Sequence, residues 1–207
     1  AILTADASVK TLTDLRGKRM AAAKFTTNYW LFEFFAKRAG LELAKMDIQS
    51  SEVSGIITLF MAGRVDTAHL WEPALTDVEL KAPGRFRRLE YDREWTALTG
   101  RRINPYIAVA AHESWVKENA ALVPRLFATY KDAERFAAQH PDEAARIIAR
   151  GTKIPAEVIR QVMDKDRMRI RVAWASELGD DIKAVFEAAR EAGVLDQVPD
   201  SAIIYRP

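Results

Sequence analysis

Cysteine is absent from this sequence of 207 residues. That absence excludes thiol nucleophiles, CxxC redox chemistry, cysteine-ligated zinc and disulfides, although it says little about the cellular compartment. No apolar run approaches the roughly 20 residues of a transmembrane helix. Glycine is sparse, with 9 residues and no cluster. The sequence accordingly lacks a phosphate-binding P-loop, a GxGxxG fingerprint and a GxSxG nucleophile elbow.

The sequence also lacks an excess of positive or negative charge. The 31 Lys and Arg against 29 Asp and Glu leave a formal charge of +2, too small to indicate a nucleic-acid partner. Short basic clusters occur among the acids and are best explained by solvated loops; their members are Arg85, Arg87, Arg88, Arg101 and Arg102.

The three histidines, His69, His112 and His140, are too far apart in sequence to form a local metal motif. His69 lies in an apolar segment, where a structural histidine is favoured over a metal ligand. Nothing in the sequence indicates a catalytic dyad. We therefore expect a protein that is not an enzyme and that has no metal and no cofactor.

What the sequence does contain is an alternation of short apolar segments with helical ones. We predict strands at 19–23, 46–50 and 67–71, each followed by a helix, a shorter strand after Gly84 and a last strand at 106–111. Residues 92–102 show no clear pattern, and from about residue 120 onward the sequence is almost purely helical. Strands alternating with helices predict an α/β fold whose sheet is at least partly parallel and is covered on both faces.

Polar side chains gather in three predicted strand-to-helix turns, Phe25–Asn28, Ser50–Ser54 and Leu70–Pro73. In open α/β sheets, ligands lie outside the carboxyl ends of the strands. Helix N-termini at that edge present unpaired N–H groups that suit anions. These turns can hold a small polar or anionic molecule; the candidate ligand-binding residues are Thr26, Thr27, Asn28, Ser51, Glu52, Ser54, Trp71 and Glu72. For each of these residues taken singly, an ordinary cap or core role is an equally good explanation.

The order of motifs along the chain resembles the periplasmic substrate-binding proteins of ABC importers. Residues 11–20 (TLTDLRGKRM) are similar to the entry into the second lobe of the nitrate/sulfonate/taurine group, which includes binders of thiamine-pyrimidine precursors. Residues 62–68 (AGRVDTA), followed by Trp71-Glu72-Pro73, resemble a second signature of that group. Residues 117–119, 136–137 and 140–145 match the helical run that follows the lobe crossover.

This resemblance implies a type II-like periplasmic binding fold, in which a hinge closes two α/β lobes over a ligand. By analogy, residues 8–104 are the second α/β lobe, and residues 105–207 are the return crossing with the C-terminal helices of the first lobe. The N-terminal part of the first lobe is expected to be missing. A face left uncovered in this way is expected to pair with a second copy of the chain. Asp66 matches a family position and is interpreted as structural.

The function implied is an exported or periplasmic binding component that captures a sulfonate, nitrate, taurine or related small solute. It delivers this solute to the membrane permease of an ABC importer. Two alternatives share the fold: a ligand-sensing domain, and a thiamine-pyrimidine synthase, whose chemistry in that family depends on cysteines that this chain lacks. The Thr and Asn side chains suit an anion, whereas Trp71 with Glu72 suits a cationic or aromatic solute.

Overall fold

The computed structural model describes residues 1–105 and 107–207, and the backbone alone of Asp92. These residues form two compact units, which are described separately. Unit 1 comprises Ala1–Arg102 with Ala184–Val198, and unit 2 comprises Ile103–Lys183 with Pro199–Pro207. The predicted lobes, 8–104 and 105–207, stay a prediction.

Unit 1 is an α/β unit built on short strands. Its strands are β1 Ile2–Thr4, β2 Met20–Ala22, β3 Ile48–Ser50, β4 Thr67–His69 and β5 Arg87–Leu89. Its helices are η1 Leu12–Leu15, α1 Thr27–Arg38, η2 Leu43–Lys45, α2 Val53–Met61, α3 Ala74–Lys81 and α4 Asp92–Thr99, together with the later part of α9 Gly179–Glu191. The predicted alternation of strands and helices is confirmed over this unit.

The sheet is mixed, with the strand order β3-β2-β4-β1-β5. Strand β2 is parallel to both β3 and β4, and β1 is antiparallel to β4 and β5. The registers place Met20 opposite Ile48 and Thr67, and Ile2 opposite His69 and Leu89. The three parallel strands therefore end at one edge, called the carboxyl edge below, as predicted for a partly parallel sheet.

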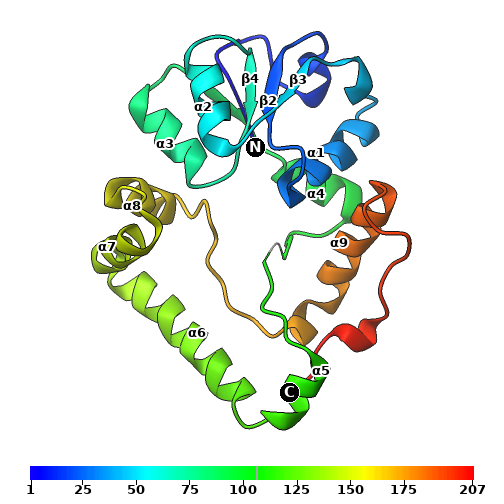
Figure 1. The fold of residues 1–207 in the computed structure, drawn as a ribbon, viewed down its shortest axis with the longest axis vertical. Helices are drawn as coiled ribbons and strands as arrows, with labels where there is room; N and C mark the ends of the chain where they lie inside the picture. Colours follow the sequence, from blue (N-terminus) through cyan, green and yellow to red (C-terminus); the bar gives the residue numbers. More distant parts are fainter. Residues whose placement is uncertain (106) are drawn as a thin grey trace. The chain divides into compact units, whose positions relative to one another are not determined.

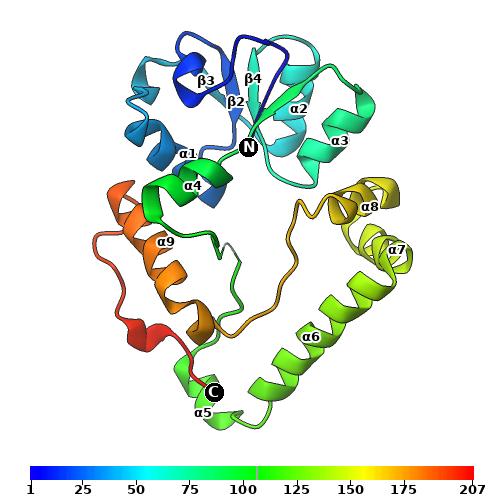
Figure 2. The ribbon, with the colours of Figure 1, turned by 180° about the vertical axis from the view of Figure 1, so that it is seen from behind.

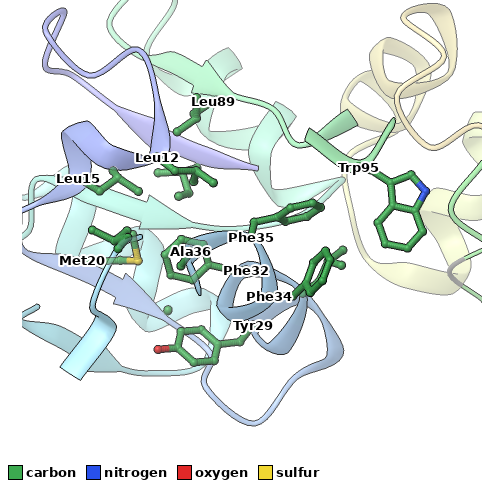
Figure 3. Packing of buried hydrophobic residues seen from close by; sticks show 14 of the residues in the cluster. Leu12, Leu15, Met20, Tyr29, Phe32, Phe34, Phe35, Ala36, Leu89 and Trp95 are labelled. Atoms are coloured by element: carbon green, nitrogen blue, oxygen red, sulfur yellow. The ribbon is translucent and has the colours of Figure 1, made fainter. Parts of the chain in front are cut away.

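Helices cover both faces of the sheet, because successive strand residues point to opposite sides. On one face Ile2, Met20 and Ala22 pack with the aromatic side chains of α1, with Trp95 of α4 and with Ala188 of α9 (Figure 3). On the other face Leu3, Ala21 and Ala68 pack with α2 and α3. Figures 1 and 2 show α1 on one side of the sheet and α2 with α3 on the other.

One helix was not predicted from the sequence, and one predicted strand is not formed. Residues 92–99 form helix α4. Its apolar face is too short to show a helical period in the sequence, although Trp95 within it is buried at 3% exposure. Ile107–Ala111 is not a strand in the structure, since none of the described strands pairs with it and Ile107 is 85% exposed. Tyr106, at the start of that predicted strand, lies outside the described residues.

Unit 2 is helical, as the sequence predicts. It contains α5 Glu113–Glu118, α6 Val123–Gln139, α7 Pro141–Thr152, α8 Ala156–Asp164, η3 Ala175–Leu178, the first turn of α9 and η4 Ser201–Ile203. Prolines open α6 and α7, where a missing N–H costs nothing. Ala144 and Ala145 of α7 and Val158, Ile159 and Val162 of α8 are its buried apolar residues.

Candidate functional site

The carboxyl edge of the sheet has the geometry of a ligand site in an open α/β fold. Strands β2 and β4 are adjacent and parallel. After β2 the chain enters α1 on one face, and after β4 it enters α3 on the opposite face. Neighbouring strands whose helices leave on opposite faces leave a crevice between the two connecting loops. The predicted turns Phe25–Asn28 and Leu70–Pro73 flank this position, and the turn after β3 lies at the same edge.

The start of α1 is the most cationic of the three turns. Thr26 is the N-cap: its hydroxyl donates to the carbonyl of Ala23 at 2.8 Å and accepts from the N–H of Tyr29 at 3.4 Å. Thr26 is therefore a structural cap, while exposed Thr27 and half-buried Asn28 begin the helix. The first N–H groups of a helix have no partner within it. Exposed Lys24 adds a positive charge just before this turn, which contains no carboxylate.

The start of α2 carries a negative charge. Its N-cap is Glu52, which is exposed and makes no capping hydrogen bond, and Ser54 is also exposed. The N–H of Ser51 donates to the carbonyl of Ala22, which ties this turn to the end of β2 at 3.1 Å. A side chain at Gly55 would place its Cβ only 2.0 Å from the Ser51 hydroxyl oxygen. Glycine therefore lets this turn pack tightly, while Glu52 makes it less suited to an anion.

The start of α3 is already occupied by a side chain of the protein. The Oε2 atom of Glu72 accepts from the N–H of Thr76 at 3.1 Å, and its Oε1 pairs with Arg88 at 2.6 Å. Burial alone would lower the pKa of Arg88, but hydrogen bonds from its guanidinium to Glu79 and Glu72 outweigh that effect and raise it. Glu72 is thus engaged within the protein on both oxygens. Arg88, expected in a solvated loop, is instead a partly buried member of β5 with 10% side-chain exposure.

Aromatic side chains border the same edge. Phe25, between Lys24 and Thr26, is 80% exposed. Trp71 is half-buried and packs against the core on the α2 and α3 face. An exposed ring beside the cationic turn offers apolar surface to the organic part of a ligand.

Beneath the edge, on the α1 face, lies a group of buried rings around His69. The ring of His69 lies 5.3 Å from that of Phe32, 6.2 Å from that of Tyr29 and 6.2 Å from that of Tyr91, between ring centroids. Burial lowers the pKa of His69 well below its usual value, and burial with the nearby charge of Glu33 raises the pKa of Tyr29 to about 12. His69 is buried as expected, but its Nδ1 has no hydrogen-bond partner.

At the opposite, amino edge of the sheet there is a separate hollow of about 350 Å³. Phe60 and Phe86 line it, with their ring centroids 4.5 Å apart, and its charged side chains include paired Lys18 and Asp6. Asp66 also borders it and accepts hydrogen bonds from the backbone and the guanidinium of Arg19 at 2.8 to 3.1 Å. The structural role predicted for Asp66 is confirmed. Because the acidic side chains of this hollow are paired within the protein, the carboxyl edge is the better candidate site.

Within residues 1–105 and 107–207, no group of three or more His, Asp or Glu side chains is placed to hold a metal ion. In the same part of the chain, none of the helices combines the length and the apolar character needed to span a membrane.

Comparison with known proteins identifies the family. The sequence profile of the NMT1/THI5-like family matches residues 1–144, more than half of the chain. The chain belongs to this family. The resemblance stated from the motifs is therefore confirmed at the level of the family.

Curated relatives are binding proteins of similar sequence. The chain is 24% identical over 145 residues to a proposed binding protein of Brucella abortus, and 23% identical over 164 residues to a proposed aliphatic sulfonates-binding protein of Escherichia coli. These matches cover 70% and 79% of this chain, but only 44% and 49% of the respective relatives. The chain thus corresponds to about half the length of these proteins.

Solved structures share the fold. The periplasmic aliphatic sulphonate binding protein SsuA of E. coli superposes with a TM-score of 0.74 at 20% identity, covering 100% of this chain and 65% of that structure. The alkanesulfonate-binding protein SsuA of Xanthomonas axonopodis, bound to MOPS, gives a TM-score of 0.63 at 15% identity, covering 98% of this chain and 66% of that structure. The fold of this chain is that of periplasmic binding proteins, as the sequence implied.

The structure brings the predicted site residues to one edge but separates their roles. Thr27, Asn28 and Ser54 lie at open helix starts, whereas Thr26 and Glu72 are held by bonds within the protein. Sequence reasoning missed Lys24 and the exposed ring of Phe25. The signal for Lys24 was present, since a lone cation directly precedes the polar turn.

Proposed function

We propose that the chain carries part of the solute site of an exported ABC-importer binding protein, and that its solute is a small organic anion such as a sulfonate. The start of α1 supports this proposal most strongly. There, open N–H groups, the Thr27 hydroxyl, the Asn28 amide and Lys24 occur together at the crevice, and the turn itself has no carboxylate; Glu33, further along α1, interacts with Lys24. Helix N-termini of this kind favour anions. Delivery to a membrane permease and a periplasmic location are part of this proposal.

The apolar surroundings favour a solute with an organic part over nitrate. Phe25 is 80% exposed, and Trp71 lies at the end of the adjacent strand. Nitrate has no carbon chain with which to cover such rings, whereas an alkanesulfonate does. Taurine would in addition need a carboxylate for its ammonium group, and Glu72 is already paired with Arg88. A sulfonate with an apolar tail therefore fits the described residues best.

The test is a titration of the chain with butanesulfonate, followed by NMR of the backbone amides. We expect the N–H signals of Thr27 and Asn28 to shift saturably and nitrate to bind more weakly. Asn28→Asp keeps the side chain's size but places a carboxylate at the helix start, so butanesulfonate should bind at least about tenfold more weakly. Gln139→Glu, the same chemical change at an exposed position of α6, is the matched control and should bind as the parent does.

A folded chain in which millimolar butanesulfonate moves neither signal would overturn this proposal. Binding that Asn28→Asp leaves intact would place the anion elsewhere. If the chain were instead a ligand-sensing domain, the titration would give the same result. The two functions differ only in the protein that the ligand-bound chain contacts.

We also propose that the chain self-associates. Three exposed apolar side chains follow one another at four-residue spacing at the start of α6: Leu122, Leu126 and Tyr130, with 43%, 41% and 45% exposure. Residues four apart share a helix face, and a contiguous exposed apolar face favours an interface. Sedimentation velocity should show a dimer at micromolar concentration, and a monomer at all concentrations would contradict self-association.

A further inference from the structure

A second concave surface of unit 1 lies at the amino edge of the sheet. Most of its lining residues precede β2, β4 and β5 or follow β1, whose antiparallel course brings its end to the same edge. The hollow measures about 350 Å³, which is at the lower end of the range for small-molecule pockets, about 300–1,000 Å³. Because it lies at the opposite end of the strands from the turns of the proposed solute site, the two sites are distinct.

One side of the hollow is apolar. Phe60 of α2 and Val65 are each 3% exposed, and Phe86, which directly precedes β5, is half-buried. The ring centroids of Phe60 and Phe86 lie 4.5 Å apart, with an angle of 40° between the ring planes. Aromatic rings at such distances attract one another, so a flat ring that enters the hollow can pack against this pair.

The two acidic side chains of the hollow are each matched by a cation. Oδ2 of Asp6 lies 2.6 Å from Nζ of Lys18, and Oδ1 accepts from the N–H and the hydroxyl of Ser8 at 2.8 and 2.6 Å. The hydrogen bonds from Lys18 and Ser8 hold the pKa of the Asp6 carboxyl well below its usual range. Asp66 is paired with Arg19 at 2.8 Å. The negative charges that border the hollow are therefore already neutralised.

Arg85 is the further cation that lines the hollow. Its side chain is exposed, and its guanidinium carbon lies 5.1 Å from the centroid of the Phe86 ring. Among the side chains that the structure describes, no carboxylate pairs with Arg85. A guanidinium stacked on a ring keeps its N–H edge available, and that edge can bind a carboxylate with two parallel hydrogen bonds. The hollow therefore combines one positive charge in excess with an aromatic wall.

We propose that the hollow is a second ligand site and that it binds a small aromatic monocarboxylate. The ring of the ligand packs against Phe60 and Phe86, and its carboxylate accepts hydrogen bonds from Arg85. One negative charge matches the excess cation, whereas a second would lie beside Asp6 and Asp66 without a cation of its own. The inference does not rest on the proposed function, because the two sites share no residue.

The test is a titration of the whole chain with benzoate, followed by NMR of the backbone amides. We expect the N–H signals of Gly63 and Phe86 to shift saturably at millimolar benzoate, because an ion pair exposed to water is weak. Saturating butanesulfonate should leave these shifts unchanged. Benzamide, which has nearly the same shape but no charge, should bind at least about threefold more weakly.

Two arginine variants test the charge. Arg85→Gln should bind benzoate at least about threefold more weakly than the parent and should bind benzamide nearly as the parent does. Arg64→Gln is the matched control, because it makes the same chemical change at an exposed position that does not line the hollow, although both its neighbours do. It should bind benzoate as the parent does.

A third variant tests the aromatic wall. Phe86→Leu keeps an apolar side chain but removes the ring, so it should weaken the binding of benzoate about threefold and that of cyclohexanecarboxylate less. Because Arg85 is exposed, its variant should keep the unfolding midpoint of the parent. The charge can therefore be tested even if Phe86→Leu does not fold.

A folded chain in which tens of millimolar benzoate move neither signal would overturn this inference. So would an Arg85→Gln chain that binds benzoate as the parent does, an equal loss of affinity in Arg64→Gln, or displacement of benzoate from the hollow by butanesulfonate. Binding of benzoate without binding of butanesulfonate would support the second site and overturn the proposed function. The reverse result would overturn the second site alone.

Discussion

The two units reach stability by different means. Unit 1 buries large rings around its sheet: Phe32, Phe34 and Phe35 of α1 are at most 3% exposed. In unit 2, by contrast, the longest helix, α6, has no buried residue among its 17 positions. The buried residues of unit 2 are small or medium in size and lie where α7 packs on α8. A sheet covered on both faces gives unit 1 its core, whereas in unit 2 helix α6 leaves Leu126 and Tyr130 exposed.

The aromatic side chains show the same contrast. Most buried rings of unit 1 belong to one cluster around α1. In unit 2 the ring of Trp174 stacks on that of Phe127 with a centroid distance of 4.0 Å and lies tilted to that of Tyr205 at 5.9 Å. Tyr205 remains 37% exposed. The candidate site is in unit 1, so the unit with the larger buried core carries the groups that must be held in place.

The largest effect is expected from truncating a core ring. Phe32→Ala removes a side chain that is 0% exposed and contacts the rings of Tyr29, His69 and Tyr91. It should lower the free energy of unfolding of unit 1 by about 3–5 kcal/mol. Leu126→Ala, at 41% exposure in α6, should cost less than about 1 kcal/mol. Peptide-resolved hydrogen exchange measures both, and equal losses would remove the contrast between the units.

A smaller effect should appear on acidification. Burial depresses the pKa of His69, so below the ordinary histidine pKa of about 6.5 the unfolded chain takes up a proton that the folded chain does not. Stability should therefore fall as the pH drops below that value, with a slope of up to about 1.4 kcal/mol per pH unit for one proton. Urea unfolding between pH 7.5 and 5.5 measures this slope.

Two histidine variants test whether the pH dependence of stability comes from unit 1. His69→Phe should flatten it, because no proton is then taken up at this position on unfolding. His140→Gln, at an exposed position of unit 2, should leave it in place. A profile in which His69→Phe keeps the full slope would locate the responsible proton elsewhere.

The sequence predicts most of the fold because the spacing of apolar residues and the residues that end helices and strands are local features. Small apolar runs such as 19–23 ended at polar turns, and Gly17, Gly40 and Gly63 closed helical turns with positive φ angles of 69° to 74°. Helix α4 was missed because Trp95 is the one buried residue among 93–99, the part of the helix whose side chains are described. The predicted strand at 106–111 relied on apolar residues alone, and a strand also needs a neighbour with which to pair.

The site could be predicted only in part, for a related reason. Strand-to-helix turns can be read along the chain, and all three lie at the carboxyl edge. The state of each side chain there depends on contacts distant in sequence. Arg88 and Glu72 are 16 residues apart, and no local pattern indicates that one neutralises the other. A charged residue in a predicted turn, such as Glu72, is therefore not necessarily available to a ligand.

The smallest effects concern one glycine in each unit. In α2, a Cβ at Gly55 would meet the Ser51 hydroxyl oxygen at 2.0 Å and Ser51 Cβ at 3.2 Å. Gly55→Ala gains helix propensity but must displace Ser51, so we expect a net loss of about 0.5–1 kcal/mol. In α7, a Cβ at Gly151 meets nothing within 4 Å, so Gly151→Ala should stabilise the chain by about 0.5 kcal/mol through helix propensity. A lower unfolding temperature for Gly55→Ala and a higher one for Gly151→Ala would confirm that unit 1 is closely packed at Gly55 and that unit 2 is open at Gly151. A gain for both variants would show instead that the turn after β3 has room, and that the contrast between the units does not extend to the candidate site.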